Sequence, residues 1–182
     1  MRLLVTFTLA LAVSAGAFAE PPVIDFVGLV PGVSTEADYD ATLVKYSGGR
    51  KAISVGGFEI ICIPDYIDGK LAELLCPLGE KAGSIVLPAF IFASNTEIHR
   101  VLVDGYIKKF GNPNSSHDEP VQTRTGVKYL RSIVIWIDSR GNQLMLISRT
   151  SNVNEGGIVL KSSAKLAIEK IEARALEQKK KF

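Results

Sequence analysis

Apolar residues recur at helical spacing in three parts of this 182-residue chain. The spacing predicts helices over residues 35–46, 94–110 and 163–178. Ser34 or Thr35 is the expected N-cap of the first helix, and Ser94 with Glu97 forms a capping box at the start of the second. The third helix has an apolar side that we expect to pack on the domain: Leu166, Ala167, Ile168, Ile171 and Ala175.

Shorter apolar runs predict strands between the helices. They cover residues 26–30, 51–55, 58–63, 70–75, 84–92, 121–125, 133–137, 142–147 and 157–160, whereas the polar residues 112–120 indicate a loop. The strongest pair is 133–137 with 142–147, a central hairpin in which Ile133, Ile135 and Ile137 share one face and Trp136 points to the core on the other. This order predicts an α+β fold, with a mainly antiparallel sheet and helices packed on one face.

The first 19 residues have the pattern of a secretory signal peptide. Arg2 is followed by the apolar run from Leu3 to Val13, and Ala17-Phe18-Ala19 provides the small residues before a cleavage point at Ala19-Glu20. The run is shorter than the roughly 20 residues that cross a bilayer. We therefore expect a single exported domain over residues 20–182, in a periplasm or outside the cell, with no transmembrane segment.

Cys62 and Cys76 are the two cysteines of the chain. An even number in an exported protein favours a disulfide. The pair Asp68-Gly69 suits a two-residue hairpin turn, which places Tyr66 opposite Leu71. One bulge residue would then bring Cys62 beside Cys76. Two buried free thiols are the alternative.

The charge balance argues against a nucleic-acid-binding protein. The chain has 21 Lys and Arg against 19 Asp and Glu, a net charge of +2, and its basic cluster at 179–181 indicates a solvated helix end. Glycine-rich phosphate or dinucleotide motifs are absent from the sequence, so no cofactor is expected.

Residues with catalytic or metal-binding chemistry are few. His99 fits the flank of a helix near the surface, and His117 fits a solvated loop; neither combines with the cysteines into a zinc pattern. The neighbours Ser116, His117 and Asp118 cannot converge as a triad. We therefore expect a protein without enzymatic activity and without a bound metal.

The residues favoured for binding another protein are two exposed aromatics and the carboxylates beside one of them, at the predicted hairpin tip. They are Tyr66 with its neighbours Asp65 and Asp68, and Tyr129. Tyrosines are common at interfaces because they combine a large apolar ring with a hydroxyl.

The two halves of the chain also have a similar order of predicted elements. A helix followed by a hairpin occurs in residues 26–92 and again in 93–182, either as two related halves or as two generic α+β units. Together with the helix start Pro31-Gly32-Val33-Ser34-Thr35, this arrangement over residues 26–150 resembles the β-lactamase-inhibitor-protein-like architecture, and each half resembles the small outer-membrane-assembly lipoprotein domain. The chain departs from the lipoprotein in lacking a lipidated cysteine. The resemblance implies a protein-binding scaffold and no catalysis.

Three functional hypotheses follow. The first is a non-enzymatic, exported protein-binding or inhibitor-like module. The second is a hydrolase with a cleft formed by two of five carboxylates: Asp65, Asp68, Asp118, Glu119 and Asp138. The third is a structural accessory of an envelope complex, which docks through the terminal helix.

Overall fold

The structure is a computed structural model that describes residues 22–48, 52–55, 58–78, 85–86, 95–123, 125–150 and 155–180. The signal peptide and its cleavage point lie outside these residues, as do Ser94 and most of the strand predicted at 84–92. The elements in chain order are α1 (Glu36–Ser47), β1 (Ile53–Val55), β2 (Phe58–Ile60), β3 (Ile63–Ile67), β4 (Lys70–Leu78), β5 (Ile85–Val86), α2 (Asn95–Phe110), β6 (Ser115–Gln122), β7 (Lys128–Ile137), β8 (Gln143–Ile147), β9 (Gly156–Lys161) and α3 (Ser163–Lys179).

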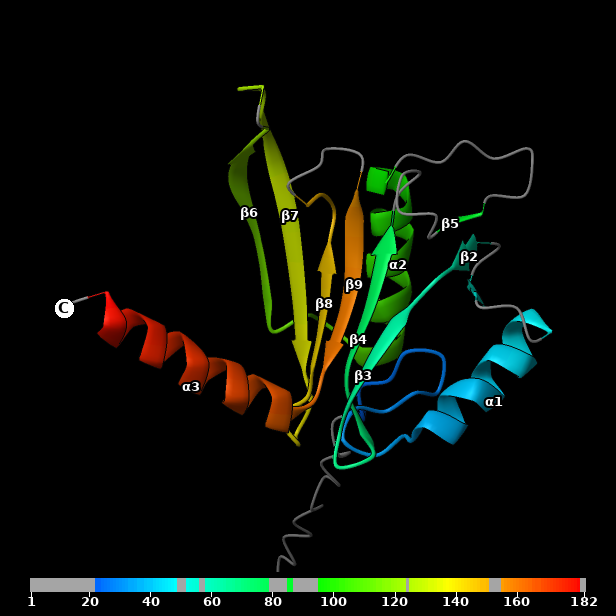
Figure 1. The fold of residues 1–182 in the computed structure, drawn as a ribbon. Coiled ribbons are helices and arrows are strands. Elements are labelled where there is room, and N and C mark those ends of the chain that lie inside the picture. Colours follow the sequence, from blue (N-terminus) through cyan, green and yellow to red (C-terminus); the bar gives the residue numbers. More distant parts are fainter. Residues whose placement is uncertain are drawn as a thin grey trace, which may run out of the picture.

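A six-stranded antiparallel sheet is the centre of the fold, in the order β3-β4-β9-β8-β7-β6 (Figure 1). β9 lies between β4 and β8, so the last strand joins the early hairpin to the late one. A smaller sheet, β1-β2-β5, lies beside α1. The predicted α+β class with a mainly antiparallel sheet is therefore confirmed.

The core forms between the six-stranded sheet and α2. Side chains at alternate positions of the central strands are almost completely buried: Trp136, Leu144, Leu146, Ile158 and Leu160. They meet the apolar stripe of α2, in which Ile98, Leu102 and Tyr106 follow one another at four-residue spacing. The predicted central hairpin is confirmed as β7–β8, and Trp136 lies in the core at 2% exposure.

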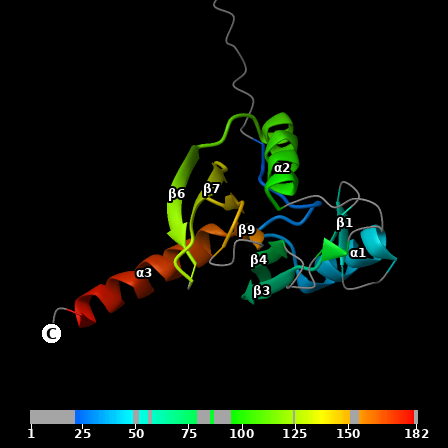
Figure 2. The ribbon, with the colours of Figure 1, turned by 90° about the horizontal axis from the view of Figure 1, so that it is seen from above.

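The predicted placement of all helices on one face is not confirmed. Figure 2 shows α2 on one side of the six-stranded sheet, while α3 runs away from the sheet on the other side. None of the residues of α3 is buried. Of the apolar side expected to pack on the domain, Leu166 is half-buried, and Ala167, Ile168, Ile171 and Ala175 are exposed. The face opposite α2, here called the open face, carries apolar side chains from five strands: Ile63, Leu75, Ile133, Ile135, Ile137, Met145, Ile147 and Val159.

The loop predicted at 112–120 is wrong, because residues 115–122 form the edge strand β6. β6 pairs with β7 over its whole length, from Ser115 opposite Ile135 to Gln122 opposite Lys128. Its composition is polar because most of its side chains are exposed, which hides the apolar alternation of an ordinary strand. The strand predicted at 121–125 is the end of β6, which stops at Gln122.

Both edge strands of the six-stranded sheet contain a proline. Pro64 lies in β3 and Pro120 lies in β6. Proline has no backbone N–H to donate, so it is tolerated at a sheet edge and rarely in a central strand.

The segment before α1 is a tight turn, and the strand predicted at 26–30 is wrong. Phe26 and Leu29 form an isolated bridge with two mutual backbone hydrogen bonds of 3.0 and 2.9 Å. Val27 and Gly28 between them have φ values of 50° and 90°, the positive values of a type I′ turn. Thr35 then caps α1 in a capping box with Asp38, which confirms one of the two predicted N-caps.

A β-bulge sets the register of the β3–β4 hairpin. Tyr66 pairs with Leu71, as predicted, but Asp65 pairs with Glu73, so Ala72 is the extra residue. This shift of one residue in the register brings Cys62 beside Cys76, as the disulfide requires.

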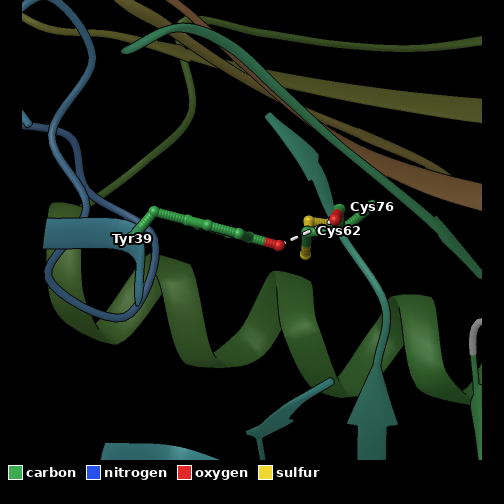
Figure 3. Close-up of a disulfide and its surroundings, with 3 residues drawn as sticks. All are labelled: Tyr39, Cys62 and Cys76. Atoms are coloured by element: carbon green, nitrogen blue, oxygen red, sulfur yellow. Dashed lines mark hydrogen bonds between the residues drawn. A yellow bond between two sulfur atoms is a disulfide. The ribbon is translucent and has the colours of Figure 1, made fainter. Parts of the chain in front are cut away.

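Cys62 and Cys76 form a disulfide, with their Cα atoms 4.2 Å apart (Figure 3). Both are buried, at 6% and 0% exposure. Tyr39 of α1 donates a hydrogen bond of 2.8 Å to the backbone carbonyl of Cys62. The disulfide therefore joins β4 to the residue before β3, and the tyrosine ties α1 to the same point.

One buried carboxylate holds together three distant segments. Asp138, between β7 and β8, is 6% exposed and accepts hydrogen bonds of 2.9 Å from the backbone N–H of Arg140 and of Asn142. It also accepts from the Asn142 side-chain amide at 3.1 Å and from the backbone N–H of Ile24 at 3.3 Å. The Asn142 side-chain oxygen accepts from the backbone N–H of Ser163, the first residue of α3, at 3.1 Å.

Replacing both cysteines by alanine should lower the stability of the domain by about 3 kcal/mol, because the disulfide restricts the unfolded chain. For a domain of this size the loss corresponds to a fall in Tm of about 6–12 °C. Calorimetry of the variant and of the reduced wild-type protein checks this. A Tm equal to that of the oxidised wild type would contradict it.

Replacing Asp138 by alanine should cost roughly 2–4 kcal/mol, because four donors, three of them in buried hydrogen bonds, lose their acceptor. Urea unfolding of D138A measures the loss. The matched control is D104A, which removes an exposed carboxylate from α2 and should change the free energy of unfolding by less than about 0.5 kcal/mol. If the two substitutions had equal effects, the hydrogen bonds of Asp138 would not be a major source of stability.

Candidate functional site

The predicted binding residues at the hairpin tip have different surroundings. Asp65 is exposed and accepts a hydrogen bond of 2.7 Å from the ammonium group of Lys165 in α3. This hydrogen bond and the charge of Lys165 lower the pKa of Asp65. Asp68 is exposed in the turn, with a φ of 50°. The two carboxylates are thus on the surface, and one of them contacts the start of α3.

Tyr66 is not the exposed aromatic that the sequence suggested. Its side chain is half-buried against the core, and its hydroxyl is buried without a hydrogen-bond partner among the described residues. Burial raises its pKa to about 12, and the charges of Glu36 and Asp40 on α1 add to the shift. The ring therefore lies near α1, where it contributes mainly to packing.

Tyr129 is half-buried near the end of the β6–β7 pair. Its hydroxyl donates to the backbone carbonyl of Thr150, and the guanidinium of Arg149 lies 5.7 Å from the centre of its ring. The tyrosine is thus fixed in one orientation, and it lines a groove together with His99 and Asp118 that the sequence did not reveal.

The five carboxylates of the hydrolase hypothesis are held in separate surroundings. Asp118 and Glu119 are neighbours on β6, so their side chains point to opposite faces of the sheet, and Glu119 pairs with Arg131. The carboxylate of Asp138 accepts hydrogen bonds from the turn between β7 and β8. The two grooves that Asp118 lines contain none of the other four carboxylates.

Among the described residues no group of three or more His, Cys, Asp or Glu could hold a metal ion. No described helix is long and apolar enough to cross a membrane.

A groove of about 780 Å³ lies between α2 and the strands β6 and β7. The N-terminal half of α2 forms one wall, and the sheet face that points toward α2 forms the other. Its lining residues are Glu97, His99, Arg100 and Val103 from α2, Ser116 and Asp118 from β6, and Ser132 and Val134 from β7. We call this feature the His99 groove.

His99 is the buried polar residue of this groove. It is 7% exposed, in contrast to the surface position expected from the sequence. Its Nε2 atom is buried and has no hydrogen-bond partner among the described residues. Burial lowers the pKa of His99, while a hydrogen bond to the backbone of Leu146 and the charge of Asp118 oppose this shift. Since Nε2 is unpartnered, the bond to Leu146 leaves Nδ1 as the donor and Nε2 as a free acceptor.

The register explains how the polar residues of the groove come together. Ser116 pairs with Val134 and Asp118 pairs with Ser132, so all four side chains point to the face covered by α2. The sequence conceals this arrangement because residues 115–122 lack the apolar alternation of a strand. The signal that could have located His99 is its position next to Ile98, inside the apolar arc of α2.

Comparison with known protein families, curated proteins and solved structures finds no match for this chain.

The lowered pKa of His99 makes stability depend on pH. An unfolded histidine takes up a proton near its ordinary pKa of about 6.5, before the buried His99 does, so the folded state loses stability as the pH falls through this range. We expect the fall in Tm between about pH 7.5 and about pH 5.5 to be larger for the wild type than for H99Q.

The matched control is H117Q, which removes the exposed histidine of β6. This variant should retain the larger fall in Tm. If H99Q retained it as well, or if H117Q abolished it, the burial of His99 would not be its cause.

Proposed function

We propose that this chain is an exported, non-enzymatic protein-binding module that docks on its partner through α3 and the neighbouring open face. The observation that carries the proposal is α3, a helix of 17 residues, fully described by the structure, in which no residue is buried and three large apolar side chains are exposed. A helix of this length is only marginally stable alone in water, so an apolar side without cover favours a partner that supplies it.

The apolar side of α3 is well exposed. Ile168, Ile171 and Leu176 are 41%, 67% and 56% exposed. Ile168 and Ile171 are three residues apart and share one side of the helix, whereas Leu176, five residues further on, lies toward a neighbouring side. An apolar stripe of this kind is the usual contact surface of a helix that binds in a groove.

The base of α3 fixes its direction. Ser162 caps the helix, and the Lys161 ammonium group contacts Glu169 at 2.7 Å. Lys165 contacts Asp65 at 2.7 Å and Glu73 at 3.4 Å. These contacts anchor the first two turns to β3, β4 and β9, and leave the apolar stripe free of them.

The open face extends the proposed surface. Ile63, Leu75 and Ile137 are 58%, 39% and 47% exposed, and Ile133, Ile135, Met145 and Ile147 are half-buried. A contiguous apolar patch of this kind is typical of an interaction site. Asp65 and Asp68 at the hairpin tip border the same surface, since Asp65 contacts the first turn of α3.

Export is supported by the signal-peptide pattern of residues 1–19 and by the disulfide, which is typical of oxidising compartments. The resemblance to inhibitor-like and outer-membrane-assembly domains belongs to the same proposal. The division into halves 26–92 and 93–182 is also part of the proposal. The order of elements supports it, because α1 precedes the hairpin β3–β4 in the first half and α2 precedes the hairpin β7–β8 in the second.

Photo-crosslinking from α3 tests the proposal in the organism that makes the protein. A photoreactive residue at Ile171 should give one defined adduct, and the variant I168D/I171D should reduce complex formation at least about tenfold by removing apolar contacts. The matched control K170S/E172S changes polar positions of the same helix and should leave the complex intact. A photoreactive residue at Asp104 on α2 should give no adduct.

Loss of the complex in both double variants, or an adduct from Asp104 equal to that from Ile171, would overturn the docking surface. Mass spectrometry of the exported protein separately checks that its chain begins at Glu20.

A further inference from the structure

The surface proposed for docking consists of two parts, the exposed helix α3 and the apolar open face of the sheet. We propose that its partner is a second copy of this chain, with α3 of each copy lying across the open face of the other. The inference rests on the proposed function, because it uses the same surface and identifies what binds there.

Each part of this surface is the usual cover of the other. An apolar sheet face is normally packed against helices, as α2 is on the opposite face of this sheet. α3 exposes three large apolar side chains, and none of its residues is buried. A second copy supplies both a helix and an apolar face, and a two-fold pair covers each of them twice.

The open face is not covered by α3 of the same copy. The helix leaves the sheet on the side opposite α2 (Figure 2). The cap at Ser162 and the contact of Lys165 with Asp65 hold its first turns at the β3 side of the face. Ile63 and Leu75 on that face remain 58% and 39% exposed. A helix that covers them therefore comes from another molecule.

The open face contains a row of apolar side chains whose length suits α3. The strand registers place one residue of each of five adjacent strands side by side: Ile63, Leu75, Val159, Met145 and Ile135. Five strands about 4.8 Å apart span about 19 Å. A helix of 17 residues is about 25 Å long, so α3 reaches across the whole row.

The side of α3 that carries Ile168 and Ile171 is suited to lie on this row. Ala167 and Ala175 are on the same side and are exposed. Their short side chains let the helix approach the sheet, so that both isoleucines reach it. A stable interface buries about 800 Å² of each partner. A two-fold pair favours such an area, because each copy has both its helix and its open face covered.

Charge favours an antiparallel arrangement of the two helices. The base of α3, formed by the β3–β4 hairpin tip, the β7–β8 turn and residues 161–169, carries a net charge of −1 from five carboxylates and four cations: Asp65, Asp68, Glu73, Asp138 and Glu169 against Lys70, Arg140, Lys161 and Lys165. Residues 170–180 carry +2 from four cations and two carboxylates: Lys170, Arg174, Lys179 and Lys180 against Glu172 and Glu177. Placing the end of each helix at the base of the other brings opposite net charges together.

Sedimentation velocity of the exported, oxidised protein tests the pairing without any variant. The wild-type chain should sediment as a dimer with a dissociation constant of about 1–10 μM. A protein that remains monomeric up to about 200 μM, well above this range, overturns the proposal.

Two variants, each altered in one part of the surface, test whether helix and face bind each other. I168D/I171D alters α3, and I63D/L75S alters the open face. Each should raise the dissociation constant of its own dimer at least about tenfold, because apolar contacts are lost. In an equimolar mixture the intact helix of one variant can lie on the intact face of the other, so a heterodimer should form more tightly than either homodimer.

This recovery also shows that both variants are folded. The matched control K170S/E172S should dimerise as the wild type does. If the open-face variant dimerised as the wild type does, or if the mixture gave no heterodimer, pairing of helix with face would be overturned.

The photo-crosslink from Ile171 separates this proposal from the docking function. An adduct with the mass of two copies supports both. An adduct with a different protein leaves the docking surface in place and overturns the second copy as its occupant. If no adduct of any kind forms, both proposals are overturned.

Discussion

The carboxylate of Asp138 is the constraint on which the arrangement of distant segments depends. A buried charge is tolerated only where donors surround it, and here they come from the turn after β7 and from the N-terminal segment at Ile24. Through Asn142 the same network reaches Ser163, so the direction in which α3 leaves the sheet is set at this point. The surface proposed for docking therefore depends on a polar network that lies outside it.

Local signals in the sequence were sufficient for the parts of the fold that local chemistry determines. The cap at Thr35, the central hairpin and the disulfide register follow from side-chain capping, alternation and turn geometry. β6 could not be predicted in this way, because an exposed edge strand obtains its stability from pairing with β7. The groove depends on that strand, so the burial of His99 beside Asp118 was hidden for the same reason.

The last helix shows the opposite limitation. Its apolar spacing correctly predicted a helix with an apolar side, but spacing does not say what covers that side. The part of the domain that the structure describes does not bury it. Apolar residues in a sequence can be selected for contact with another molecule as well as for the core, and only the position of the helix relative to its own sheet separates the two cases.

The six-stranded sheet has the His99 groove on one face and the open face on the other. Alternation along β6 and β7 sends Asp118 and Ser132 toward the groove, and Glu119, Arg131 and Ile133 toward the open face. The prolines of the edge strands have a further consequence. Pro64 and Pro120 interrupt the row of backbone donors at both margins of the sheet, so a strand from a second molecule cannot pair along either margin without a gap. The two prolines therefore hinder edge-to-edge pairing between the six-stranded sheets of two molecules.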